Sequence, residues 1–104
     1  PDVERAAMEI LRFKAEWDEA LLHDMDDDGL ENLALSIVDS LDRVRDLDPA
    51  NAHTLRHQVE LLIGPGKDRP RALQILEEMR EQSMDPEFVT LVVRGGCTAP
   101  FAQA

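Results

Sequence analysis

The pattern apolar-Asp-Pro occurs twice in this sequence, as Leu47-Asp48-Pro49 and as Met84-Asp85-Pro86. Each copy ends one stretch of helical hydrophobic periodicity and precedes another, and the two prolines, at positions 49 and 86, are 37 residues apart. An aspartate followed by a proline suits a helix N-terminus, because the carboxylate can accept from free backbone N–H groups and the proline lacks a donor that would be unpaired there anyway. Helix starts repeated at this interval are typical of stacked helical hairpins, whose repeats are about 34 residues long.

Apolar residues recur at helical spacing in four segments before Pro86, and we predict each of these segments to be a helix. The segments are 3–22, 28–46, 49–63 and 68–79. Asp28, with Glu31 three residues later, resembles a capping box and predicts the start of the second helix. Gly64-Pro65-Gly66 should end the third helix, and Asp68 should cap the fourth.

The segment 86–94 is rich in valine and threonine and is therefore also compatible with a strand. A lone strand would leave its backbone N–H and C=O groups unpaired, whereas a helix can pack on the preceding helix. We therefore predict a short fifth helix here. With 104 residues, the chain should form one all-α domain over 1–96, followed by a loose tail at 97–104.

The charge of the chain bears on its partners. It carries 22 acidic and 11 basic residues, for a net charge of −11. Nucleic acids and anionic membranes are bound mainly through lysine and arginine, so both are disfavoured, whereas a basic peptide or protein would be attracted. The chain has one cysteine and no apolar run of the roughly 20 residues that span a bilayer, which predicts a soluble, cytoplasmic protein.

Taking Pro49 as the end of one repeat, Leu55 and Leu62 fall at large positions of the next first helix, and Ala72 and Leu76 fall at small and large positions of the second. On these residues, the segment from about 34 to 93 resembles a divergent member of the tetratricopeptide repeat superfamily. The resemblance implies antiparallel helix hairpins stacked as a short right-handed solenoid of about five helices. It also implies a non-catalytic protein-interaction module, an adaptor or small chaperone that binds a peptide or helix of a partner.

In such a groove, the first helix of each pair supplies the recognition surface. The resemblance therefore implies four partner-binding candidates on the third helix, which are His53, Arg56, His57 and Glu60. His53, His57 and Glu60 also share one helix face at a spacing that permits a metal ion, although no fourth ligand is evident. No cofactor is implied, and an oligomer is compatible with the sequence.

A second resemblance gives an alternative function. Ala72-Leu73, Met79, Pro86 and Thr90 have the spacing of one pentatricopeptide repeat, a kind of helical repeat that binds RNA. RNA reading would need several such repeats and a positive groove, and the net charge of the chain argues against it.

The acidic segment between the first two helices gives another alternative. Asp24, Asp26 and Asp28 alternate before Gly29, as in a calcium-binding loop, and Asn32 lies at the ninth position, where an oxygen ligand is allowed. A calcium- or metal-responsive regulatory element is therefore a second hypothesis. The twelfth position lacks the usual glutamate, so an acidic turn without bound metal is the simpler interpretation.

The remaining residues with reactive or aromatic side chains suggest no enzyme. Cys97 follows two glycines, and no histidine occurs in a motif that would activate it. Trp17 lies on the apolar stripe of the first helix, where core packing is expected. Because the sequence contains no paired nucleophile and base and no phosphate-binding loop, we predict that the chain is not an enzyme.

Overall fold

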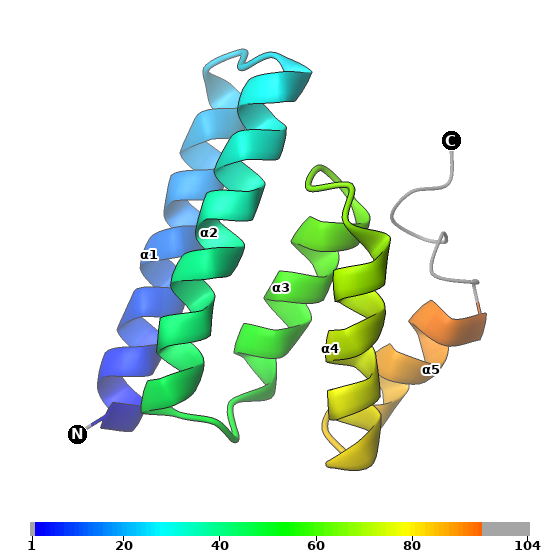
Figure 1. Ribbon diagram of the computed structural model, residues 1–104. Coiled ribbons are helices and arrows are strands. Elements are labelled where there is room, and N and C mark those ends of the chain that lie inside the picture. Colours follow the sequence, from blue (N-terminus) through cyan, green and yellow to red (C-terminus); the bar gives the residue numbers. More distant parts are fainter. Residues whose placement is uncertain (1, 95–104) are drawn as a thin grey trace.

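The computed structural model describes residues 2–94, which form five helices and no strand (Figure 1). The helices are α1 (Asp2–Leu22), α2 (Asp27–Leu47), α3 (Ala52–Ile63), α4 (Arg69–Glu81) and α5 (Pro86–Arg94). The predicted all-α class is therefore confirmed for these residues, and so is the helical state of 86–94. The predicted tail at 97–104, including Cys97, lies outside the described residues.

Each helix packs against the next one in the chain, and the chain reverses direction at every turn (Figure 1). The Cα atoms extend over 36 × 35 × 18 Å, so the molecule is about half as thick as it is wide. As a result, α1 and α5 lie at opposite ends of the row, and each of them packs mainly on a single neighbour.

The hydrophobic core runs through all five helices, and α3 has more buried residues than any other helix. Its largest fully buried side chains include Ile37 and Leu41 of α2, Leu55 and Leu62 of α3, and Met79 of α4. These residues follow the helical spacing seen in the sequence, because each helix turns one apolar stripe toward its neighbours.

The start of α2 differs from the prediction. Asp26, not Asp28, is the N-cap: it has an extended backbone, and its carboxylate accepts a hydrogen bond of 2.7 Å from the Gly29 N–H. Asp28 already lies inside the first turn, so Glu31 is not placed for a capping box. Residues 26–28 are three consecutive aspartates, and the sequence alone does not distinguish which of them is the N-cap. In the structure the helix begins after the first of them.

The start of α3 also differs. Asp48 and Pro49 do not begin this helix, because the Asp48 N–H donates to the Val44 carbonyl and ends α2 instead. The Asn51 N–H then donates to the Asp48 carbonyl across a turn that contains Pro49, a position that proline favours. Asn51 is the N-cap, and its side chain accepts from the His53 N–H at 3.0 Å.

The other two predicted helix starts are confirmed. Asp68 caps α4 by accepting from the Arg71 N–H at 3.2 Å. Helix α5 begins at Pro86, and the Asp85 carbonyl accepts its first hydrogen bond, from Val89. Asp85 itself has φ 43°, in the left-handed region that aspartate tolerates better than most residues. None of the helices in residues 2–94 is long and apolar enough to cross a membrane.

Candidate functional site

An open, mostly apolar groove of about 270 Å³ lies between α1 and α3. Its described lining consists of Ala7, Ile10, Leu11 and Lys14 on α1, and of Asn51 and His53 at the start of α3. Leu11 remains 65% exposed, and Val3, two turns earlier on the same helix, is 61% exposed. The wall of the groove formed by α1 therefore presents apolar surface to solvent.

Helix α1 buries few of its residues for its length. Among its 21 residues only Ala6, Ile10 and Phe13 are buried, and Trp17 packs partly against the core. The predicted core position of Trp17 is thus confirmed in part. Apolar side chains outside this stripe, including Met8, are exposed. Exposed apolar surface of this kind is a feature of interaction sites.

Of the two predicted histidines, only His53 faces the groove. It is exposed, whereas His57, one turn later, is only 8% exposed, and its Nε2 has no hydrogen-bond partner among the described residues. Burial lowers the pKa of His57 to about 4, with Lys14 lowering it further and Asp18 opposing the change. His57 is therefore neutral at pH 7 and lies inside the molecule.

Arg56 connects α3 to α5. Its guanidinium lies 4.7 Å from the centre of the Phe88 ring and donates a hydrogen bond of 3.4 Å to the Asp85 carboxylate. The Glu60 carboxylate is 3.8 Å from the other side of the same guanidinium. Burial raises the pKa of Glu60, and Arg56 and Lys14 oppose this rise. The four predicted residues are thus brought together on one helix, but three of them make contacts within the fold.

The opposite side of the molecule is closed by polar contacts between α2 and α4. Arg71 donates to Asp39 at 3.1 Å and to Asp42 at 3.0 Å, and Arg45 pairs with Glu78. These partners are about 30 positions apart in the sequence, and hydrophobic periodicity gave no indication of them. These five charged side chains are therefore held by contacts within the fold.

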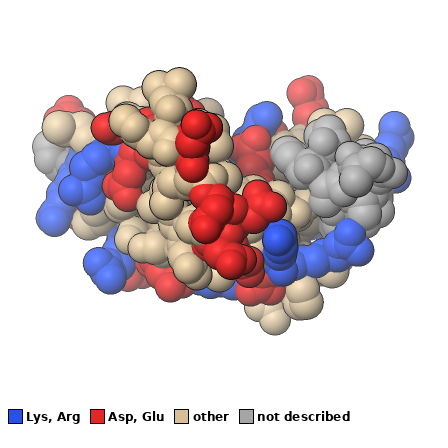
Figure 2. All heavy atoms as spheres, turned by 90° about the horizontal axis from the view of Figure 1, so that it is seen from above, with Lys and Arg blue, Asp and Glu red and all other residues tan. Residues whose placement is uncertain are grey.

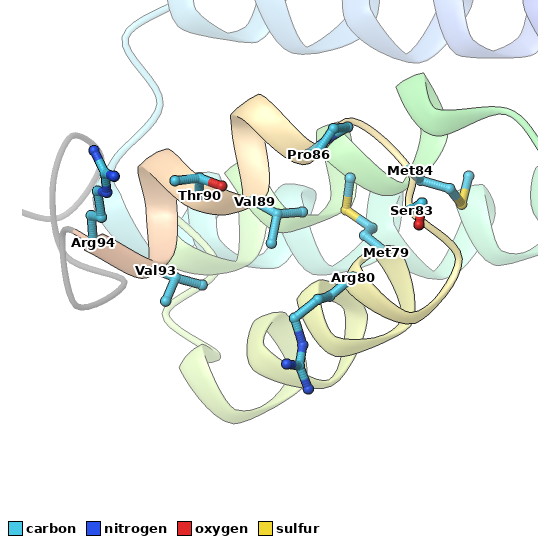
Figure 3. A pocket seen from close by; sticks show the side chains of 9 residues that line it. All are labelled: Met79, Arg80, Ser83, Met84, Pro86, Val89, Thr90, Val93 and Arg94. Atoms are coloured by element: carbon cyan, nitrogen blue, oxygen red, sulfur yellow. The ribbon is translucent and has the colours of Figure 1, made fainter.

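A second apolar pocket lies between α4 and α5, and the sequence analysis missed it. Its volume is about 290 Å³, and nine of the described residues line it (Figure 3). Met79, Val89 and Val93 point toward the space between the two helices, while Arg80 and Arg94 extend outward from it (Figure 3). The available signal in the sequence was α5 itself, which has more apolar residues than one buried face requires.

The acidic segment between α1 and α2 is exposed. Asp24, Asp26, Asp28 and Asn32 all lie on the surface, and the Asp26 carboxylate is occupied as the cap of α2. Within residues 2–94, no group of three histidine, cysteine or acidic side chains is placed to hold a metal ion. Figure 2 looks onto the end of the molecule that holds this turn and shows a group of acidic side chains near its centre, with both acidic and basic side chains toward its edges.

We compared the chain with protein-family models, with curated proteins and with solved structures, and none of them matches it. A functional proposal therefore depends on the two apolar surfaces, the groove between α1 and α3 and the pocket between α4 and α5.

Proposed function

We propose that this protein is a non-catalytic interaction module, an adaptor or small chaperone that binds a peptide or helix of a partner in the groove between α1 and α3. The observation that carries the proposal is the apolar wall that α1 contributes to that groove, where Leu11 remains 65% exposed. An amphipathic helix laid into such a groove would bury this surface.

We also propose that the helices form a short right-handed solenoid of antiparallel hairpins of the tetratricopeptide kind. In this arrangement α1 with α2 and α3 with α4 are hairpins, and α5 begins a third. The order of packing along the chain supports this proposal. The groove then lies between the first helices of two successive hairpins, which is where the resemblance places the recognition surface.

The partner that fits this groove is apolar on one face and basic elsewhere. Lys14 is the one charged side chain among the described groove residues, so the contacts at short range are mainly apolar. At long range, the net charge of −11 attracts a basic partner and accelerates its encounter. Binding should therefore weaken moderately with salt without disappearing.

A labelled model helix tests the proposal. The probe is a peptide of about 18 residues, or five helical turns, with leucine along one face and lysine on the others. Its fluorescence anisotropy should report saturable binding to the full chain. Leu11→Glu should weaken that binding about tenfold, since a charge would replace an apolar contact, which corresponds to about 1.4 kcal/mol.

Leu22→Glu is the matched control, because it places the same charge on the same helix at a residue that is 83% exposed and outside the groove lining. It should change the affinity less than about twofold, as expected for a residue outside the contact. Equal losses in the two variants, or no saturable binding to the unmodified chain, would contradict the proposal.

A further inference from the structure

The pocket between α4 and α5 has a floor suited to apolar side chains. Met79 is fully buried beneath it, Val89 is 6% exposed, and Val93 on its edge is 56% exposed. Methionine side chains adapt to differently shaped apolar groups, and Met84 adds a second one at the turn between the helices. Two helices that flank an apolar floor form the kind of surface that receives a third helix.

The charged side chains among the described lining residues of this pocket are basic, whereas the chain as a whole is acidic. The nine described lining residues include Arg80 and Arg94 but no acidic residue, although the chain has twice as many acidic as basic residues. Arg80 forms an ion pair with Glu77, which neutralises part of its positive charge. Arg94 makes no ion pair with another residue in 2–94, and its side chain extends outward from the pocket (Figure 3).

From these observations we infer that the pocket between α4 and α5 is a second docking surface, which receives an amphipathic helix whose apolar face is flanked by acidic residues. Apolar side chains of this helix would fill the space over Met79 and Val89, and its carboxylates would meet Arg94 and Arg80. This surface is separate from the groove between α1 and α3. It is selective for negatively charged helices, whereas the groove is proposed to bind positively charged ones.

RNA fits the pocket less well than an acidic helix does. Two arginines would attract phosphate, but the lining residues within 2–94 include no aromatic side chain on which a base could stack. The net charge of −11 would also repel a polyanion much more strongly than it would repel one helix with a few carboxylates.

Two labelled peptides with the same leucine face test the inference. One carries glutamate and the other carries lysine at the positions that flank this face, and both carry glutamine elsewhere. Each would be titrated into the full chain at low and moderate salt. The glutamate peptide should bind saturably, and Val93→Glu should weaken it about tenfold or more, since the change puts a carboxylate on the edge of the apolar floor.

Leu73→Glu is the matched control. Leu73 lies on α4 and is 46% exposed, but it does not line this pocket. The variant adds the same charge at another exposed apolar residue and should leave the affinity within about twofold of the unmodified chain. Equal effects of the two variants would overturn the inference.

Arg94→Glu tests the charge selectivity. It should weaken the glutamate peptide about threefold to tenfold and leave the lysine peptide no weaker, as expected when an attractive pair becomes repulsive. Preference of the pocket for the lysine peptide would overturn the inference. The proposal for the groove is tested separately, with Leu11→Glu and the lysine peptide. Either proposal can therefore be contradicted while the other holds.

Other occupants of the pocket would give different results. A second copy of the chain would appear as a dimer in sedimentation equilibrium that Val93→Glu dissociates. If the last residues of the same chain occupied the pocket, they would compete with the peptide. The peptide would then bind only to a variant such as Phe101→Asp, in which an apolar side chain of these residues is replaced by a charged one. Binding of an RNA oligonucleotide in preference to the glutamate peptide would indicate a nucleic-acid ligand. Any of these results would overturn the inference.

Discussion

The two end helices, α1 and α5, are each anchored by a phenylalanine beneath an arginine, but the two arginines come from different places. On α1, the Arg12 guanidinium lies 4.8 Å from the centre of the Phe13 ring, and both residues belong to the same helix. On α5, the guanidinium above Phe88 belongs to Arg56 of α3 and lies 4.7 Å from the ring centre. Asp85, just before α5, pairs with the same arginine.

This difference shows how each end can present a surface. Helix α5 has nine residues, of which three are buried, and it depends on contacts with other helices, because a helix of this length is not stable alone. Helix α1 has 21 residues, of which three are buried, so much of its length remains open to a partner. The groove beside α1 is open to solvent, whereas the pocket beside α5 exists only while α5 is held in place.

The largest effect that we expect comes from removing the anchor of α5. Phe88→Ala should lower the free energy of unfolding by about 3–5 kcal/mol, as buried phenylalanines do. It should cost about 0.5–1 kcal/mol more than Phe13→Ala, since the contact of Arg12 with Phe13 is local and can persist in the unfolded chain, whereas that of Arg56 with Phe88 cannot. Urea unfolding of both variants measures this difference. A larger loss in Phe13→Ala would reverse the comparison.

The next effect is the pH dependence of stability that arises from His57, which is buried on α3. Because the pKa of His57 is lowered to about 4 in the folded state from its ordinary 6.5, the unfolded chain takes up a proton first as the pH falls. The contribution of His57 to stability is therefore complete above pH 6.5 and is lost between pH 6.5 and about 4. We expect a loss of about 1–3 kcal/mol, which is measured by urea unfolding at pH 7 and near pH 4.5.

Other groups titrate in this range, so variants are needed for comparison. The raised pKa of Glu60 acts in the opposite direction, because the folded state then binds its proton more readily as the pH falls. His57→Asn removes the buried imidazole, so this variant should lose less stability on acidification than the unmodified chain does. His53→Asn, at an exposed position, should keep the original pH dependence. If His57→Asn kept it too, burial of His57 would not be the cause.

The smallest effect concerns the acidic turn beside α1. If Asp26 acts only as a cap, millimolar calcium should raise the free energy of unfolding by less than about 1 kcal/mol, and magnesium should do the same. Asp26→Ala should cost about 0.5–2 kcal/mol with or without calcium, because it removes the cap of α2. Saturable, micromolar calcium binding in calorimetry that Asp26→Ala abolishes would instead establish a calcium site.

The sequence was sufficient to predict the number of helices and the extent of α5, because apolar spacing and Asp-Pro are local signals. It was not sufficient to choose between N-caps. Asp26 and Asp28 are both suitable caps for α2, and Asp48 and Asn51 are both suitable caps for α3. The choice depends on where the neighbouring helix ends. The same limit applies to the surfaces. His53 and His57 share one helix face, but only the packed structure shows that one of them is exposed and the other buried.

The pocket between α4 and α5 could not be predicted for a similar reason. The sequence shows that α5 is apolar, but it does not show which of its apolar residues the rest of the fold leaves uncovered. Val92 is fully buried, whereas its neighbour Val93 is 56% exposed at the edge of the pocket. The rim charges are also separated in sequence, since Arg80 and Arg94 come from different helices.

The central claim is that the two ends of the molecule bind helices of opposite charge at separate surfaces. Titration of the ¹⁵N-labelled full chain with the lysine and glutamate peptides, followed by NMR, tests this claim most directly. We predict that the lysine peptide shifts amide signals of α1 and α3 around Leu11 and His53, and that the glutamate peptide shifts those of α4 and α5 around Val93 and Arg94. A single set of signals that responds alike to both peptides, or no saturable response to either, would contradict the claim.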